Sequence, residues 1–263
     1  MSTVDRIEKQ TLYVERHIED RFAVVTLNRP DHLNAGSPNL FHELSEVMEG
    51  FDGDDVIRTI VLTGGEGKSF SAGADLGDMT FEKMENCYSF VRNCHAAFES
   101  IERLPKIVLA AVNGYALGFG LEITLACDLV IASDRARFGL REMNFGLLPE
   151  VTLTRGLDII GRRRAAWLAY TATDLSAEEA CEYGLVNKVV PHDRLVPEYE
   201  SLATSLAKRA PLAVAVCKRL LTKEAGAHYR ESENVMPAIL ASKDVLEGIT
   251  AFSEHRDPRF VGN

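Results

Sequence analysis

Two glycines and a glutamate in the stretch 112–128, VNGYALGFGLEITLACD, have the spacing needed for acid–base chemistry. Gly118 and Gly120 lie at the predicted start of a helix, where backbone N–H groups without intrahelical partners can bind an oxygen that gains negative charge. Glu122 follows, and the residues three, four and seven positions beyond it are apolar. On a helix its carboxyl would therefore be desolvated, which raises its pKa and makes proton transfer near neutral pH feasible.

The same glycines are also compatible with a purely structural turn, and a single helical glutamate is often only a solvated residue. Two nucleotide motifs can be excluded. Ile123 stands where the third glycine of a dinucleotide fingerprint belongs, and Leu62 stands where a P-loop before Lys68-Ser69 requires its first glycine.

Composition limits the class of protein. With 263 residues, 46% of them hydrophobic, the chain can bury the core of one large domain or of one domain with a small appendage. A formal net charge of −10 disfavours nucleic-acid partners. The five cysteines show no C-x-x-C pair and no His/Cys ligand spacing, which predicts free thiols and no metal site. A polar N-terminus and the absence of a long apolar run favour a cytoplasmic protein without membrane contact.

Strand-like and helical patterns alternate along the chain, which predicts an α/β fold. Ser37-Pro38 has the form of a helix start, and Ser176 with Glu179 forms a capping box. We expect strands at 11–15, 22–27, 59–63, 107–112, 129–132 and 184–190, helices at 38–51, 81–103, 118–127 and 162–171, loops at 64–77 and 138–154, and an almost wholly helical region at 193–256.

Five segments, taken in order, resemble the enoyl-CoA hydratase/isomerase (crotonase) superfamily. Each one alone is weak, but five in register cover nearly the whole chain. They are Asn28-Arg-Pro30 with Asn34-Ala35, Ser71 to Leu76, Ala111 to Glu122 with Cys127-Asp128, Phe138 to Glu142 with Gly146 to Pro149, and Glu247 to Phe260.

The resemblance implies a crotonase-like fold, a spiral of ββα repeats with two roughly perpendicular sheets. It divides the chain into a spiral core with the active site at 1–191 and a C-terminal α-helical trimerisation region at 192–263. The expected assembly is a homotrimer or a dimer of trimers.

The same resemblance implies a catalytic site. The backbone N–H groups of Ala74 and Phe119 would form an oxyanion hole for a thioester oxygen, with Phe119 in place of the usual glycine. Glu122 and Glu142 would hold a water between them and add it across a double bond. No metal or redox cofactor is implied, and coenzyme A enters only as part of the acyl-CoA substrate.

Substrate contacts are implied for a further set of positions. Asp31 and Gly77 stand where lysines that help to bind coenzyme A are frequent in the family. Arg29 or Arg256 are the candidates to compensate for the loss of these two cations. The expected substrate-binding and coenzyme A-binding residues are Arg29, Ala35, Ser71, Ala72, Asp75, Leu76 and Gly118.

Glu150 departs from the glycine-rich hydratase pattern that follows Pro149. In some isomerases of the family an acidic residue at this point shuttles a proton, so Glu150 is either a third functional carboxylate or a residue that shapes the pocket. Four more residues are candidates for the acyl pocket or for ordinary core: Met79, Phe81, Met84 and Phe145.

The resulting hypothesis is an enoyl-CoA hydratase acting on a 2-enoyl-CoA thioester. One alternative is a Δ3-Δ2 enoyl-CoA isomerase that uses Glu150. The other is a noncatalytic protein of this fold, such as the RNA-binding relatives, which the net charge of −10 disfavours.

Overall fold

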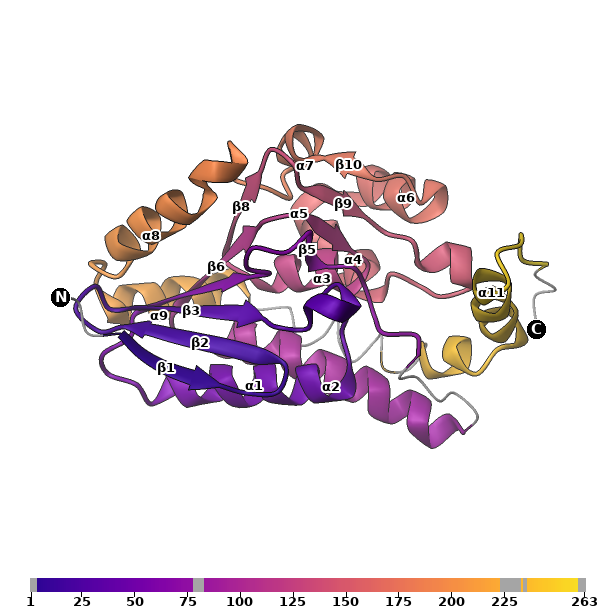
Figure 1. The fold of residues 1–263 in the computed structure, drawn as a ribbon, viewed down its shortest axis with the longest axis horizontal. Helices are drawn as coiled ribbons and strands as arrows, with labels where there is room; N and C mark the ends of the chain where they lie inside the picture. The colour runs from indigo at the N-terminus through magenta and orange to yellow at the C-terminus, as the bar shows by residue number, and fades with distance from the viewer. Residues whose placement is uncertain (1–3, 78–82, 223–232, 234–235, 260–263) are drawn as a thin grey trace.

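The computed structural model describes residues 4–77, 83–222, 233 and 236–259, and it confirms the α/β class (Figure 1). The strands are β1 (Val4–Glu8), β2 (Leu12–His17), β3 (Phe22–Leu27), β4 (Thr59–Thr63), β5 (Ser69–Ser71), β6 (Ile107–Val112), β7 (Tyr115–Leu117), β8 (Leu129–Ser133), β9 (Arg137–Gly139), β10 (Leu175–Ser176) and β11 (Lys188–Val190). The α-helices are α1 (Pro38–Asp52), α2 (Met84–Arg103), α3 (Phe119–Ala126), α4 (Glu150–Thr154), α5 (Gly156–Ile160), α6 (Arg162–Thr171), α7 (Ala177–Tyr183), α8 (Leu195–Leu206), α9 (Pro211–Leu221) and α11 (Lys243–Ser253). Short 3-10 helices are η1 (Pro30–His32), η2 (Glu142–Phe145) and η3 (His192–Arg194).

The larger sheet has seven strands in the order β1-β2-β3-β4-β6-β8-β11. The predicted hairpin is confirmed, because β2 and β3 pair antiparallel, whereas the strands from β3 to β11 pair in parallel. All of β4 and five of the six residues of β6 are buried. Strands buried on both faces read as continuous apolar runs, which is why the sequence identified them.

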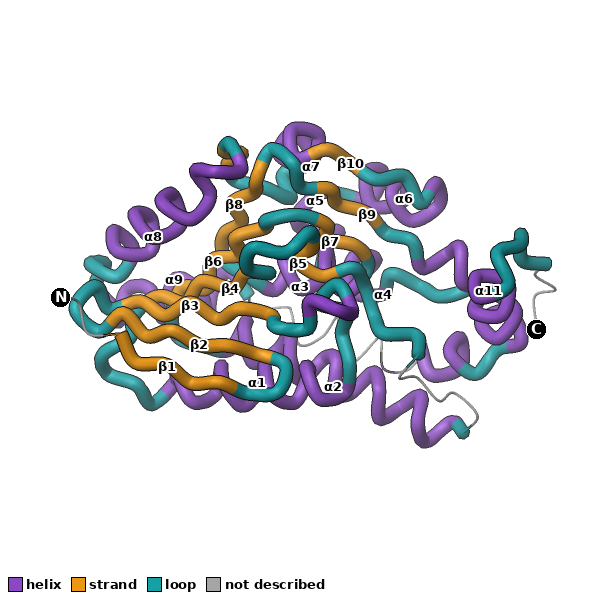
Figure 2. The backbone as a smooth tube through the Cα atoms, viewed as in Figure 1, coloured by secondary structure: helices purple, strands orange, loops and turns teal. Residues whose placement is uncertain are grey.

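Helices cover both faces of this sheet (Figure 1, Figure 2). On one face, Leu195 and Tyr199 of α8 pack with Val61 and Leu109 of the sheet. On the other face lies the main core, which includes apolar side chains of α1, α2 and α3. The predicted start of α1 is confirmed, since Ser37 Oγ accepts a hydrogen bond of 3.2 Å from the Leu40 N–H.

The second sheet has four short strands in the order β10-β9-β7-β5. The resemblance implied two sheets, but none of these four strands was predicted from the sequence pattern. Strand β7 lies inside the turn that the sequence placed directly between the strand ending at Val112 and the helix starting near Gly118, so that interpretation was wrong. β7 pairs in parallel with β5. This pairing brings the segment after Ser71 next to the segment before Phe119.

The C-terminal part is helical as predicted, with α8, α9 and α11 in its described residues. One end of α9 is fixed to the core by Lys218, whose ammonium group donates to Asp128 Oδ2 at 2.7 Å and to the Lys106 carbonyl oxygen at 3.0 Å. The boundary expected at residue 191 stays a prediction. None of the helices that the structure describes is long and apolar enough to cross a bilayer.

Candidate active site

Two glycine-containing loops meet at the centre of the candidate site. A Cβ placed on Gly118 would lie 3.6 Å from the Cα of Gly73, so the two backbones are in close approach. Gly73 has φ +114° and Gly118 has φ +51°, conformations that residues with a side chain rarely adopt. Ala74 and Phe119 each directly follow one of these glycines, which places two backbone amides on neighbouring loops.

Both amides are available to a ligand. Around Ala74 the backbone bonds run from the Gly36 N–H to the Gly73 oxygen and from the Asp75 N–H to the Gly36 oxygen, and neither uses the Ala74 N–H. Phe119 is the first residue of α3, where an N–H has no intrahelical acceptor. Within the residues that the structure describes, neither amide donates a hydrogen bond to another protein group. Such a pair can stabilise an oxyanion.

Glu122 is buried on α3, and its predicted apolar surroundings are confirmed. Its Oε1 accepts a hydrogen bond of 2.9 Å from the Thr152 N–H of α4. Burial raises the pKa of Glu122 well above its usual range, and the charges of Glu142 and Glu150 add to this effect. The carboxyl is therefore suited to hold a proton at neutral pH.

Glu142 is the first residue of η2, and its side chain lies against the loop at Gly118. Its Oε1 would lie 2.7 Å from a Cβ on Gly118. Its Oε2 is buried and has no hydrogen-bond partner among the described residues. Burial, helped by the charge of Glu150, raises the pKa of Glu142 to about 7. A buried oxygen without a protein partner is a position where a water or a substrate atom can be bound.

These groups line one cavity with a volume of about 570 Å³. Its walls are largely apolar, which suits an acyl chain, and they include side chains from both ends of the sequence. Residues of the wall are His32, Leu33, Ala35, Phe41, Ala72, Gly73, Ala74, Asp75, Leu76, Gly77, Phe90, Cys94, Leu117, Gly118, Phe119, Glu122, Arg141, Glu142, Phe145, Leu147, Leu148, Glu150, Met236, Leu240 and Phe252.

Five of the seven expected substrate-binding positions lie on this wall, namely Ala35, Ala72, Asp75, Leu76 and Gly118. The other two, Arg29 and Ser71, lie behind it and support it.

The guanidinium of Arg29 donates to the Ala35 carbonyl oxygen at 2.5 Å and to Asp75 Oδ2 at 2.9 Å. Ser71 is fully buried, and its carbonyl oxygen would lie 2.1 Å from a Cβ on Gly120. The glycine thus lets α3 pack directly on β5.

The other candidates lie in different places. Met79 and Phe81 lie outside the described residues. Met84 is exposed and does not line the cavity, whereas Phe145 does. Arg256, considered as a substitute cation for coenzyme A, is paired with Glu247 at 2.6 Å and does not line the cavity.

Glu150, the first residue of α4, lies on the cavity wall. Its Oε1 is 2.8 Å from Nε2 of His95, a buried residue of α2 that the sequence analysis did not identify. Two further residues of the wall with nitrogen-bearing side chains, His32 and Arg141, were also missed. Their position beside Asp31 and Glu142 was the only available signal.

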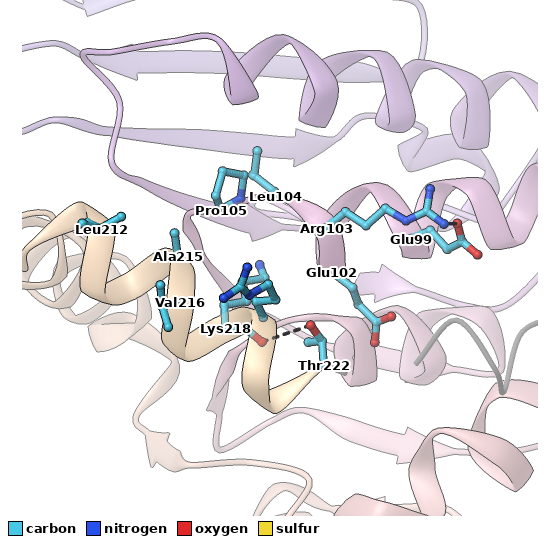
Figure 3. Close-up of a pocket in the computed structure, with 11 residues that line it drawn as sticks. Glu99, Glu102, Arg103, Leu104, Pro105, Leu212, Ala215, Val216, Lys218 and Thr222 are labelled. Carbon is cyan, nitrogen blue, oxygen red and sulfur yellow. Dashed lines mark hydrogen bonds and ion pairs between the residues drawn. The ribbon is translucent and has the colours of Figure 1, made fainter. Parts of the chain in front are cut away.

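A second cavity of about 600 Å³ lies between the end of α2 and α9 (Figure 3). Glu99, Glu102 and Lys218 contribute to its wall. Lys218 is already engaged by Asp128. The described residues contain no group of three His, Cys, Asp or Glu side chains that could hold a metal ion.

The family model described as Enoyl-CoA hydratase/isomerase matches residues 17–263. The chain belongs to this family. Among its relatives, the short-chain-enoyl-CoA hydratase of Clostridium acetobutylicum is 35% identical, over 90% of this chain and 93% of that protein. The crotonyl-CoA hydratase of Syntrophomonas wolfei is 33% identical, over 92% and 95%.

Solved structures of the family show the same fold. The enoyl-CoA hydratase/isomerase from Pseudoalteromonas atlantica superposes with a TM-score of 0.85 at 32% identity, covering 96% of this chain and all 100% of that one. An enoyl-CoA hydratase from Mycobacterium avium gives a TM-score of 0.83 at 28% identity, over 98% of both chains. The crotonase-like architecture expected from the sequence is therefore confirmed.

Proposed function

We propose that this protein is an enoyl-CoA hydratase, a lyase that adds water reversibly across the double bond of a 2-enoyl-CoA thioester. The observation that carries the proposal is the arrangement around one cavity of two buried carboxylates, Glu122 and Glu142, and two open amides, those of Ala74 and Phe119. The relatives named as hydratases support it.

The thioester oxygen accepts hydrogen bonds from the two amides, so negative charge can develop on it when water attacks C3. One donor of this kind contributes about 3 kcal/mol to the stabilisation of such a transition state. The carboxylate pair shares one proton. Its ionised member accepts a proton from the attacking water, its protonated member supplies one to C2, and the OH group of the water forms the new bond at C3.

The test is decay of the absorbance of the conjugated enoyl thioester when purified protein meets crotonyl-CoA. Glu122→Gln and Glu142→Gln keep size and one carbonyl oxygen but cannot exchange a proton, so each should lose about 100-fold or more in kcat. Glu178→Gln, at an exposed position of α7, is the control and should retain full activity. Hydration retained by both cavity variants would refute the assignment.

A second activity has its own supporting observation, since Glu150 adds a third carboxylate to the cavity wall. In Δ3-Δ2 isomerisation, Glu150 would accept the C2 proton of a 3-enoyl thioester and return it to C4, while the amides hold the dienolate oxygen. Glu150→Gln should abolish the appearance of the conjugated band from 3-hexenoyl-CoA, with Glu122→Gln still active in that reaction.

The proposed assembly is a homotrimer or a dimer of trimers. Several large apolar side chains are exposed on α6 and α9, including Tyr170 at 77%, Leu212 at 78% and Leu221 at 72%. Surface of this kind is typical of protein interfaces. Sedimentation at micromolar concentration, which measures the mass of the assembly, tests this proposal.

All five cysteines are free thiols, which supports the proposed cytoplasmic location.

A further inference from the structure

His95 is a buried titratable residue that the proposed hydration does not use. It belongs to α2, and its side chain is only 2% exposed. Its Nε2 lies 2.8 Å from Glu150 Oε1, and its Nδ1 lies 3.6 Å from Glu233 Oε1. Three segments distant in the sequence therefore meet at one imidazole ring.

The contact with Glu150 has a defined polarity. An ionised carboxylate can only accept hydrogen bonds, so the His95 tautomer that carries its proton on Nε2 is the one that can donate to an ionised Glu150. Because the ring is almost fully buried, water competes little for either partner, and the hydrogen bond is stronger than it would be at the surface.

The position of Glu150 matters to the rest of the site. Its charge contributes to the raised pKa of both Glu122 and Glu142. Two residues further along α4, the Thr152 N–H donates to Glu122. Among the carboxylates that line the cavity, Glu150 is the one whose Oε1 is in contact with His95.

We propose that His95 is a positioning residue that orients the Glu150 carboxylate toward the acyl chain and thereby supports double-bond migration more than hydration. The proposal rests on the proposed crotonase chemistry and on its isomerisation branch. Isomerisation needs no proton from outside, because the proton that Glu150 accepts from C2 returns to C4 of the same substrate. His95 neither gains nor loses a proton.

Two substitutions of similar polarity separate positioning from general stability. In His95→Gln the side-chain amide nitrogen can reach the place of Nε2 and still donate to Glu150. In His95→Asn the shorter side chain reaches only the place of Nδ1, on the Glu233 side. The two variants therefore differ in whether Glu150 keeps its donor.

The experiment measures kcat and KM for isomerisation of 3-hexenoyl-CoA and for hydration of crotonyl-CoA, with the unfolding temperature of each variant. We expect His95→Asn to lose about tenfold or more in kcat for isomerisation while KM changes less than about threefold, as for a misplaced catalytic group. His95→Gln should recover most of that loss, and both variants should hydrate within about threefold of the wild type.

Several results would overturn the proposal. Equal loss of both reactions in both variants, with a lower unfolding temperature, would show a structural role only. Unchanged isomerisation in Glu150→Gln, or a wild type that hydrates but does not isomerise, would refute this inference and leave the hydratase assignment intact. A wild type inactive on both substrates would refute both.

Discussion

Gly118 lies so close to Glu142 that a Cβ at position 118 would stand 2.7 Å from Glu142 Oε1. The glycine has φ +51° and also precedes the open amide of Phe119. One residue without a side chain thus makes room for a catalytic carboxylate and gives the chain the turn that exposes an oxyanion donor.

Gly118→Ala should therefore lose about 100-fold in kcat for crotonyl-CoA hydration, because a displacement of about 1 Å in a catalytic group has that effect. Gly161→Ala is the matched control. Gly161 also has positive φ, at +77°, but beyond its neighbours in the chain no atom of the described residues lies within 4 Å of a Cβ placed there. Both variants should lose similar stability in urea. Equal activity of the two would contradict a role for the contact with Glu142.

The pH dependence of hydration should follow the carboxylate pair. Burial and the charge of Glu150 raise the pKa of Glu142 to about 7, so the rate should fall as the pH drops below 7 and the pair loses its ionised member. Glu150→Gln removes one charge that raises the pKa values of Glu122 and Glu142. The acidic limb of the kcat profile should then move to lower pH.

The exposed Glu178→Gln change should leave that limb in place. A limb that moves to higher pH in Glu150→Gln, or does not move, would contradict this electrostatic account.

Glu122→Gln should make the protein more stable at neutral pH. Folding raises the pKa of Glu122 above its ordinary value of 4.5, so the folded state binds its proton more tightly than the unfolded state. The wild-type free energy of unfolding therefore falls as the pH rises above 4.5, by about 1.4 kcal/mol for each unit of raised pKa. Urea titrations at pH 5 and pH 8 should show a gain for the variant that grows with pH. A loss at pH 8 would contradict the raised pKa.

Lys218→Met should destabilise the fold by about 3–5 kcal/mol, because it leaves the Asp128 carboxylate, whose side chain is only 16% exposed, without its cation. Burial already raises the pKa of Asp128 despite the ammonium group at 2.7 Å, so the loss should grow as the pH rises. Lys188→Met removes an exposed partner of Glu198 and should cost less than about 1 kcal/mol. Similar losses in the free energy of unfolding of the two variants would contradict the claim that burial makes the Lys218–Asp128 pair more important than the exposed pair.

The sequence predicted the elements whose pattern is local. Continuous apolar runs identified β4 and β6, and the heptad-like apolar face around Glu122 correctly predicted its burial. Strands β5, β7 and β9 have only three residues each and form because neighbouring segments pair with them, so no local pattern marked them.

The acid–base site was predictable to different degrees. Glu142 could be connected to Glu122 only through the family resemblance, since the loop that carries it has no periodicity. His95 could not be found at all, because one histidine in an amphipathic helix gives no sign of a partner that is distant in the sequence and enters from another helix.

The cavity wall is completed by Met236, Leu240 and Phe252, which come late in the chain. A ribosome therefore synthesises both proposed catalytic carboxylates, and the amides opposite them, well before it makes the last part of the acyl cavity. We expect a nascent chain or a truncated protein that ends before Met236 to hold its acid–base pair in a cavity open to water on that side.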